Sequence, residues 1–205
     1  MRKNKGLRRR QARFQPRPRF LIVCEGTVTE PRYFRAARHA ERSLIVLQIE
    51  SGGTPKTLVE RAVELKEQAE KKARKLKDDN ERFEEVWCVF DIDEHPLVPN
   101  AKQQALANGI QLAISNPCFE FWALLHFQDQ RAHIDRTKVQ RLCRDHMPGY
   151  EKELDYEILR SKYSDARQRG DDLVKWHDSR GTTGANPSTM VHRLAERIRA
   201  HPTPY

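Results

Sequence analysis

The chain has 205 residues, of which 38% are hydrophobic and 33% are charged. This length is enough for one globular domain with its own core. No run approaches the ~20 consecutive apolar residues that a membrane helix needs, which excludes a transmembrane protein. The N-terminus also lacks the apolar segment of a secretory signal. We therefore expect a cytoplasmic protein without membrane contact.

The net charge of +9 is concentrated at the N-terminus, where residues 1–19 carry nine Lys or Arg side chains and no acidic one. Blocks of like charge are typically disordered interaction tails. Nucleic-acid backbones are their usual partners, because each neutralised phosphate releases counterions. We expect a disordered basic arm that binds nucleic acid, and a solvated tail without a dedicated ligand is the alternative. The central bases of this arm are Arg8, Arg9, Arg10 and Arg13.

The four cysteines are Cys24, Cys88, Cys118 and Cys143, and no two of them form a Cys-x-x-Cys pair. This spacing fits neither a disulfide framework nor a zinc site. Cysteine in apolar runs behaves as a small hydrophobic residue. A reducing compartment is the simplest setting for such a chain.

Four short, continuous apolar runs are typical of strands that are buried on both faces of a parallel sheet. They cover residues 20–24, 44–49, 86–90 and 110–114. Helical patterns alternate with them over residues 30–37, 55–76, 100–108 and 119–127. Thr54 as N-cap and Pro55 as first residue predict the start of the longest helix. The alternation predicts an α/β fold in residues 20–130, with a Rossmann-like, mostly parallel four-stranded sheet flanked by helices.

Residues 131–205 show helical patterns only, and we expect a helical C-terminal extension packed on the core. The expected helices cover residues 137–146 and 154–168, and a last one begins at Asn186 and Pro187. Residues 179–184, rich in glycine and threonine, are typical of a flexible loop.

Ligands of open parallel sheets bind beyond the carboxyl ends of the strands. The polar residues that follow or end the predicted strands are Glu25, Glu50, Asp91, Asp93, Ser115 and Asn116. Glu50 is the weakest of these candidates, because its turn is rich in glycine. Since parallel strands end at the same edge, we expect the acids of the first and third strands to converge.

Asp91 and Asp93 lie two residues apart in an extended segment, so both carboxylates point to one side. Neighbouring carboxylates repel each other unless a cation neutralises them. Hard oxygen ligands suit Mg²⁺ or Mn²⁺. A solvated turn is the alternative for an isolated Asp-x-Asp, but the position at a strand end favours a metal site.

Several blocks of the sequence resemble a known family. Residues 23–31 read VCEGTVTEP, residues 89–93 read VFDID, residues 115–127 read SNPCFEFWALLHF, and residues 186–189 read NPST. The first two blocks resemble the metal-binding Toprim domain of topoisomerases, primases and OLD-type nucleases. The full set is similar to the RloB-like family, which is encoded in bacterial and archaeal defence loci beside restriction–modification genes, often near an AAA-type ATPase.

This resemblance implies a Toprim-like version of the α/β fold. In it, Glu25, Asp91 and Asp93 are the catalytic acids, and they bind Mg²⁺ or Mn²⁺. The resemblance also draws in Glu30 and Glu120 as supporting residues.

The supporting residues have structural alternatives. Glu30, in the first helical turn, also complements the helix dipole. Glu120 lies among aromatic residues, where a charge is costly unless it is paired. Asn116 and His95 follow strand ends and are further supporting candidates, with contact to phosphate as one role open to His95.

The leading hypothesis is a Mg²⁺-dependent nuclease that cleaves RNA or DNA and acts as an effector in antiphage defence, through abortive infection. The alternative is a non-catalytic, nucleic-acid-binding adaptor that works with an AAA-type ATPase. A degenerate Toprim domain would lack one of the acids, and this chain keeps all three. A haloacid-dehalogenase-type phosphatase usually has Thr shortly after its Asp-x-Asp motif. Here Glu94 and His95 follow, which disfavours a phosphatase as the third hypothesis.

Overall fold

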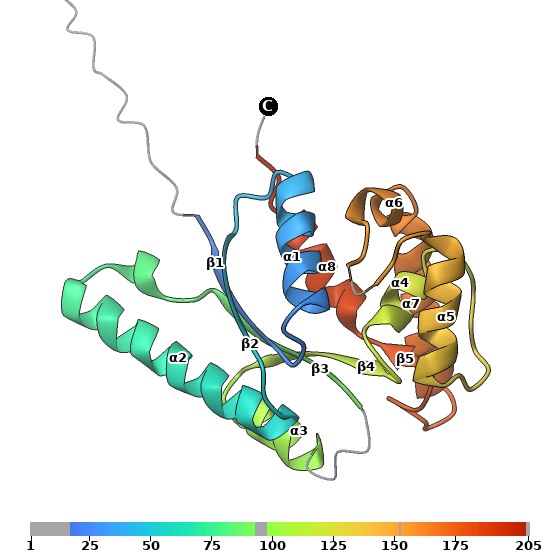
Figure 1. Ribbon diagram of the computed structural model, residues 1–205. Helices are drawn as coiled ribbons and strands as arrows, with labels where there is room; N and C mark the ends of the chain where they lie inside the picture. The colour runs from blue at the N-terminus through green and yellow to red at the C-terminus, as the bar shows by residue number, and fades with distance from the viewer. Residues whose placement is uncertain (1–16, 93–97, 152, 204–205) are drawn as a thin grey trace, which may run out of the picture.

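The computed structural model describes residues 17–92, 98–151 and 153–203. Asp93, His95 and the arm bases Arg8, Arg9, Arg10 and Arg13 lie outside the described residues. Strands and helices alternate through the first part of the chain (Figure 1). In chain order they are β1 (Arg19–Cys24), α1 (Thr29–Ala40), β2 (Val46–Ser51), α2 (Pro55–Leu76), η1 (Asp79–Glu81), β3 (Glu85–Asp91), α3 (Val98–Ala107), β4 (Gln111–Asn116), α4 (Glu120–Leu124), α5 (Arg136–His146), α6 (Tyr156–Arg160), α7 (Tyr163–Asp178), β5 (Ser188–Thr189) and α8 (Val191–Arg199).

The sheet has the strand order β2-β1-β3-β4-β5. The first four strands pair in parallel, which confirms the predicted α/β fold and its mostly parallel sheet. The fifth strand was not expected. It pairs antiparallel with β4, and the hydroxyl groups of Ser115 and Thr189 lie 3.0 Å apart across the pair. A strand of two residues is too short to produce a recognisable hydrophobic pattern.

Helices cover both faces of the sheet (Figure 1). Along β1, Leu21 and Val23 pack in a cluster with α2 and α3. Phe20, Ile22 and Cys24 point to the other face and pack in a cluster with residues of α1, α4 and α8. This alternation follows from the two-residue period of a strand. Because both faces are covered, the strand is continuously apolar, as the sequence indicated.

The observed helix boundaries agree best with the predicted ones where the sequence carries a capping signal. Thr54 caps α2 with a capping box, Pro55 is its first residue, and Lys77 ends it in the left-handed conformation. In the extension, the helix expected at 154–168 is instead two helices, α6 and α7. The helix expected at 119–127 is reduced to α4, and the last helix begins only at Val191, after β5.

Arg19 belongs to the folded domain rather than to the arm. It is the first residue of β1, its guanidinium lies 3.3 Å from the Glu81 carboxylate, and it stacks 4.8 Å from the centre of the Phe83 ring. The arm proper therefore ends before this residue, earlier than the charge pattern indicated.

All four cysteines are buried and free. Burial raises the pKa of the Cys88 and Cys143 thiols to about 12. Reactive cysteines need a depressed pKa, so these two thiols act as core residues. Within the described part of the chain, no helix has the length and apolar character to cross a membrane.

Two of the three buried histidines of the described residues, His126 and His192, lie in the core beside α4, α7 and α8. The ring of His126 donates from Nδ1 to the Trp122 carbonyl oxygen at 3.0 Å. Neither ring nitrogen of His192 has a hydrogen-bond partner within the described residues, although Asp171 Oδ1 lies 3.4 Å from its Nε2. A Cβ at Gly170 would lie 2.9 Å from His192 Nδ1, so glycine at this point of α7 lets α8 pack closely.

We expect these histidines to make stability fall steeply in mild acid. Burial lowers the pKa of both His126 and His192 from 6.5 to about 4. The unfolded chain therefore binds more protons than the folded one between these values. The resulting stability is fully present above pH 6.5 and is lost as the pH falls towards 4. Each histidine contributes about 3 kcal/mol across this window. The charged groups around His192 are Asp171, Glu196, Arg167 and Arg193.

Urea unfolding of His192→Leu at pH 7 and pH 5 tests this expectation. The variant should lose less free energy of unfolding between the two pH values than the wild type. His133→Leu, at an exposed position, is the matched control and should keep the wild-type difference. An unchanged pH dependence in His192→Leu would show that this histidine is not held neutral in the fold.

Candidate functional site

The site begins where two neighbouring strands end. β1 and β3 pair in parallel with Cys24 opposite Val89, so their carboxyl ends lie side by side. The Glu25 amide donates to the Val89 carbonyl oxygen at 2.9 Å. The Asp91 amide donates to Glu25 Oε2 at 3.0 Å. The structure thus brings Glu25 and Asp91 together, as expected from the topology.

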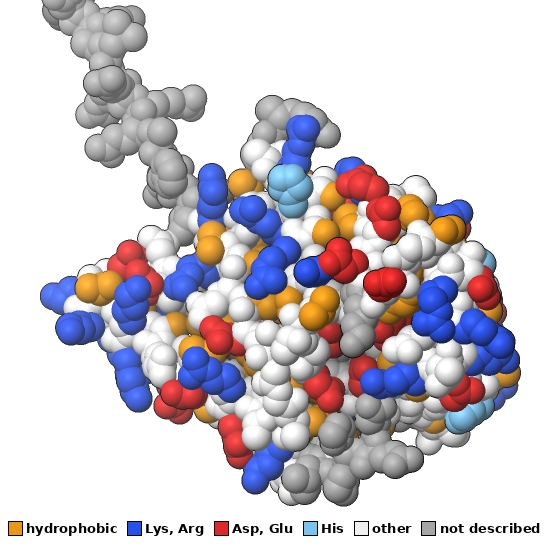
Figure 2. All heavy atoms as spheres, in the orientation of Figure 1, with side chains coloured by type: hydrophobic (Ala, Val, Ile, Leu, Met, Phe, Trp, Pro, Cys, Tyr) orange, Lys and Arg blue, Asp and Glu red, His pale blue; other side chains and the backbone are white. Residues whose placement is uncertain are grey.

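A cavity of about 330 Å³ opens beside this pair. The acidic residues that line it are Glu25, Glu30, Asp91 and Glu120. They come from three places along the sequence: the end of β1 with the first turn of α1, the end of β3, and the start of α4. In Figure 2, acidic side chains gather in the hollow between α1 and α5, and basic side chains cover the adjoining face over α5.

Glu30 is held by the loop after β1. Its Oε1 accepts a hydrogen bond from the Gly26 amide at 3.2 Å, and the residue is only 6% exposed. Burial raises the pKa of Glu30, and the negative charges of Glu120 and Glu25 raise it further. Two backbone hydrogen bonds oppose this rise. Glu30 therefore does more than complement the dipole of α1, because it faces the other acids.

Glu120 is buried but has hydrogen-bond partners. Its Oε1 accepts from the Tyr150 hydroxyl at 2.7 Å and from Gln140 Nε2 at 3.5 Å. Burial, and then the negative charge of Glu120, raise the pKa of the Tyr150 hydroxyl, which stays protonated and able to donate. These contacts fix the carboxylate at the wall of the cavity.

The surroundings of Asp91 disfavour its negative charge. Burial raises its pKa well above the usual range, and the charges of Glu30, Glu120 and Glu25 add to this effect. Arg136 opposes the rise, since its Nη2 lies 3.0 Å from Asp91 Oδ2. Among the described residues that line the cavity, one guanidinium thus faces four acids, and the cavity favours additional positive charge.

The other strand-end residues lie apart from this cavity. Asn116 Nδ2 donates to the Gly184 carbonyl oxygen at 3.0 Å, and a cis peptide bond follows at Pro117. Ser115 contacts β5, and Glu50 lies 3.9 Å from Arg61 on α2. Glu50 was the weakest candidate by sequence, in keeping with its place outside the acidic cavity.

Sequence reasoning missed Arg136 and Gln140, which line the cavity, and Tyr150, which holds the Glu120 carboxylate. All three lie in or after α5, in the segment expected to be a helical extension. An Arg or Gln at the start of a charged helix has no distinguishing local pattern. Their positions depend on how α5 packs against α4.

The donor set suits a hard divalent cation, because carboxylate oxygens are the ligands that Mg²⁺ and Mn²⁺ prefer. Among residues 17–92, 98–151 and 153–203, however, no three His, Cys, Asp or Glu side chains are arranged to hold a metal ion. Asp91 instead contacts Arg136. A cation here would be held by Glu25 and Asp91, with Arg136 moving away from Asp91.

Gly26→Ala is expected to lower any activity of this site about tenfold or more, in the range typical of residues that position metal ligands. A Cβ at Gly26 would lie 2.2 Å from Glu30 Oε2, so the Glu30 carboxylate must leave its place. In a Glu30→Ala background the obstacle is absent, and Gly26→Ala should then cost little. The activities of the two single variants and the double variant, measured side by side, test this coupling. Additive losses would show that Gly26 matters for another reason.

Comparison with known families gives one match, to the family model described as RloB-like protein, over residues 20–198. A search of curated proteins and a search of solved structures returned no significant match. The matched region includes all five strands except the first residue of β1, and every residue that lines the acidic cavity. The chain therefore belongs to the RloB-like family.

Proposed function

We propose that this RloB-like protein is a Mg²⁺-dependent nuclease that hydrolyses phosphodiester bonds in RNA or DNA. The observation that carries the proposal is the cavity lined by four carboxylates at the adjoining carboxyl ends of β1 and β3. Glu25 and Asp91 line this cavity, and the resemblance to the Toprim domain implies that they are its metal-binding acids, together with Asp93 two residues later. The further role as an effector in antiphage defence rests on the family resemblance.

The chemistry that a cation would supply here is polarisation of the scissile phosphate and a lower pKa of an attacking water. Glu25 and Asp91 are the residues proposed to hold it, together with Asp93. Glu25 also serves as general base or acid, to the extent that it is not committed to the metal. Glu30 and Glu120 border the same cavity and orient its polar groups.

Arg136 is proposed to change partners during the reaction. Its guanidinium neutralises Asp91 in this structure, at 3.0 Å. An arginine fork also binds phosphate oxygens well. Were a cation held at Asp91, the Arg136 guanidinium would contact the phosphate of the substrate instead.

The surface beside the cavity supports polyanion binding. The outer face of α5 carries Lys138, Arg141 and Arg144, all of them exposed. Basic side chains that contact phosphate give affinity and register without reading sequence. Together with the N-terminal arm, this face is proposed to hold the nucleic acid across the acidic cavity.

The test is cleavage of end-labelled single-stranded RNA, single-stranded DNA and duplex DNA by the purified full chain. We expect cleavage with Mg²⁺ or Mn²⁺ and none with EDTA. Glu25→Gln should remove it. Glu50→Gln is the matched control, because it makes the same change at the end of the neighbouring strand, outside the cavity. No cleavage of any substrate with either cation would overturn the proposal.

A non-catalytic adaptor is the second candidate. It is favoured by the Asp91–Arg136 ion pair and by the lack of a ready-made group of three metal ligands among the described residues. This alternative predicts nucleic-acid binding without cleavage under every cation, together with recovery of an AAA-type ATPase on purification from the native host.

A further inference from the structure

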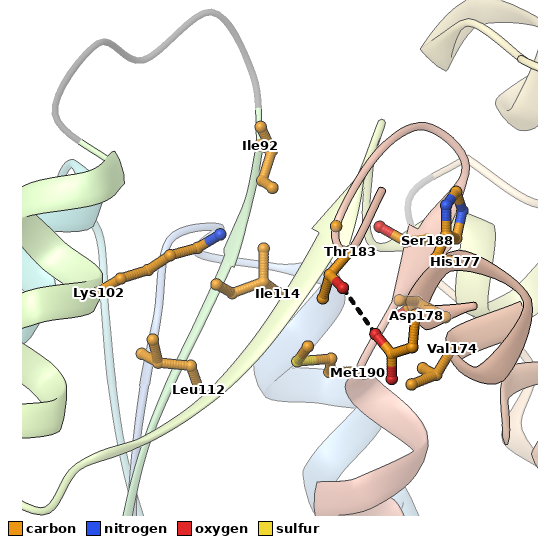
Figure 3. Close-up of a pocket in the computed structure, with 12 residues that line it drawn as sticks. Ile92, Lys102, Leu112, Ile114, Val174, His177, Asp178, Thr183, Ser188 and Met190 are labelled. Carbon is orange, nitrogen blue, oxygen red and sulfur yellow. Dashed lines mark hydrogen bonds between the residues drawn. The ribbon is translucent and has the colours of Figure 1, made fainter. Parts of the chain in front are cut away.

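A second cavity, of about 260 Å³, lies beside β4 on the face of the sheet that also carries α3 (Figure 3). Aliphatic side chains form most of its surface. They are Ile92, Leu112, Ile114, Val174 and Met190. The volume lies below the roughly 300–1,000 Å³ of pockets for drug-sized ligands. It therefore suits a single ring system better than an extended chain.

The rim of the second cavity is polar on two opposite sides. Lys102 extends over the cavity from α3 (Figure 3). Its Nζ lies close to the backbone of Gly184, because a Cβ built on that glycine would be 3.9 Å from it. On the other side, the Thr183 hydroxyl donates to Asp178 Oδ1 at 2.6 Å (Figure 3). An occupant thus meets an apolar floor, an ammonium group at one edge and a carboxylate with a hydroxyl at the other.

The wall that carries Thr183 is tied to the core. The buried ring of His177 lies 2.9 Å from the Thr182 hydroxyl and 2.8 Å from the Pro187 carbonyl oxygen. Asn116, at the end of β4, donates to the Gly184 carbonyl oxygen. These contacts hold the 179–184 loop against the sheet, so the cavity exists before any ligand arrives.

The two cavities flank the end of one strand. Asp91 lines the acidic cavity, and the next residue, Ile92, lines the second one. Successive residues of an extended chain point to opposite faces, so the cavities open on opposite sides of the same sheet edge. A strand of nucleic acid crossing that edge would present a phosphate to one side and a neighbouring base to the other.

We propose that the second cavity binds a nucleobase with an exocyclic amino group, next to the cleaved phosphate; this inference rests on the proposed nuclease function. The flat faces of the base contact the aliphatic side chains, as in sites that hold unstacked bases. Asp178 accepts a hydrogen bond from the amino group, and Lys102 contacts the phosphate backbone. A purely aliphatic ligand would make no contact with either charged group, and a small anion would leave the apolar floor unused.

Direct binding of AMP, CMP and UMP to the full chain in EDTA tests the inference, because it needs no catalysis. Saturation-transfer NMR in physiological salt provides the readout. AMP and CMP should bind about fivefold or more tightly than UMP, which lacks the amino group, as expected of one hydrogen bond. Met190→Trp, which fills the cavity, should remove this binding. Leu106→Trp is the matched control, since Leu106 lies on α3 but is 83% exposed and outside the cavity.

Asp178→Asn is a milder variant that keeps the shape of the rim. Its amide also donates, so the preference for AMP and CMP over UMP should disappear while folding is retained. Equal affinity for the three nucleotides in the wild type, or full binding by Met190→Trp, would overturn the inference even if the protein cleaves nucleic acid. Selective binding by a protein that cleaves nothing would uphold the base site and defeat the nuclease proposal.

Discussion

Asp91→Asn is expected to abolish metal-dependent cleavage while leaving the fold intact. The loss should exceed about 10²-fold, since residues that only orient metal ligands are already worth roughly 10–100-fold. The fold should persist because the environment of Asp91 disfavours its charge. Burial and three neighbouring acids raise its pKa despite Arg136, so a neutral side chain of the same shape suits the position better.

Thermal unfolding in EDTA should therefore give an unchanged or higher melting temperature for Asp91→Asn. A gain of 1 kcal/mol corresponds to about 2–4 °C for a chain of this size. With Mg²⁺ present, the wild type should gain stability and the variant should gain less, because ligand binding stabilises only the folded state that binds it. Asp145→Asn, at an exposed position on α5, is the matched control for both measurements. A variant that melts far lower in EDTA would mean that the Asp91 carboxylate is needed for folding rather than for chemistry.

Removal of residues 1–16 is expected to weaken nucleic-acid binding and to flatten its dependence on salt. This segment carries seven Lys or Arg side chains and no acid. Each neutralised phosphate contributes roughly −0.7 to −0.9 to the slope of log affinity against log salt. Three or four contacts would thus change the slope by about 2–4. The truncation must stop before Arg19, because that side chain contacts Glu81 and Phe83 within the fold.

Binding titrations at several salt concentrations measure the slope. A full-length variant with the seven bases replaced by Gln separates charge from length, and it should behave like the truncated protein. Hydrolysis of a small model phosphodiester should stay close to the wild-type rate in both variants, because the acidic cavity is intact. If affinity is unchanged at every salt concentration while a partner ATPase is lost on purification, the arm docks a protein instead.

Short-range patterns in the sequence were sufficient for the four parallel strands of the sheet and for part of the site. The continuous apolar runs identified the four parallel strands, because a strand covered on both faces must be apolar throughout. Thr54 and Pro55 located the start of α2, because capping is a local interaction. Parallel strands end at one edge, so Glu25 and Asp91 were expected to meet although 66 positions separate them, and they do.

The tertiary structure alone decided which residues complete the cavities. Arg136 reaches Asp91 across 45 positions, and Tyr150 reaches Glu120 across 30. The short strand β5 and the loop beside it close the second cavity through contacts with β4 that span 68 to 74 positions. None of these contacts repeats with a helical or strand period, so no local pattern in the sequence encodes them. They arise because α5, α7 and β5 pack against a sheet whose edge was already determined by the strands.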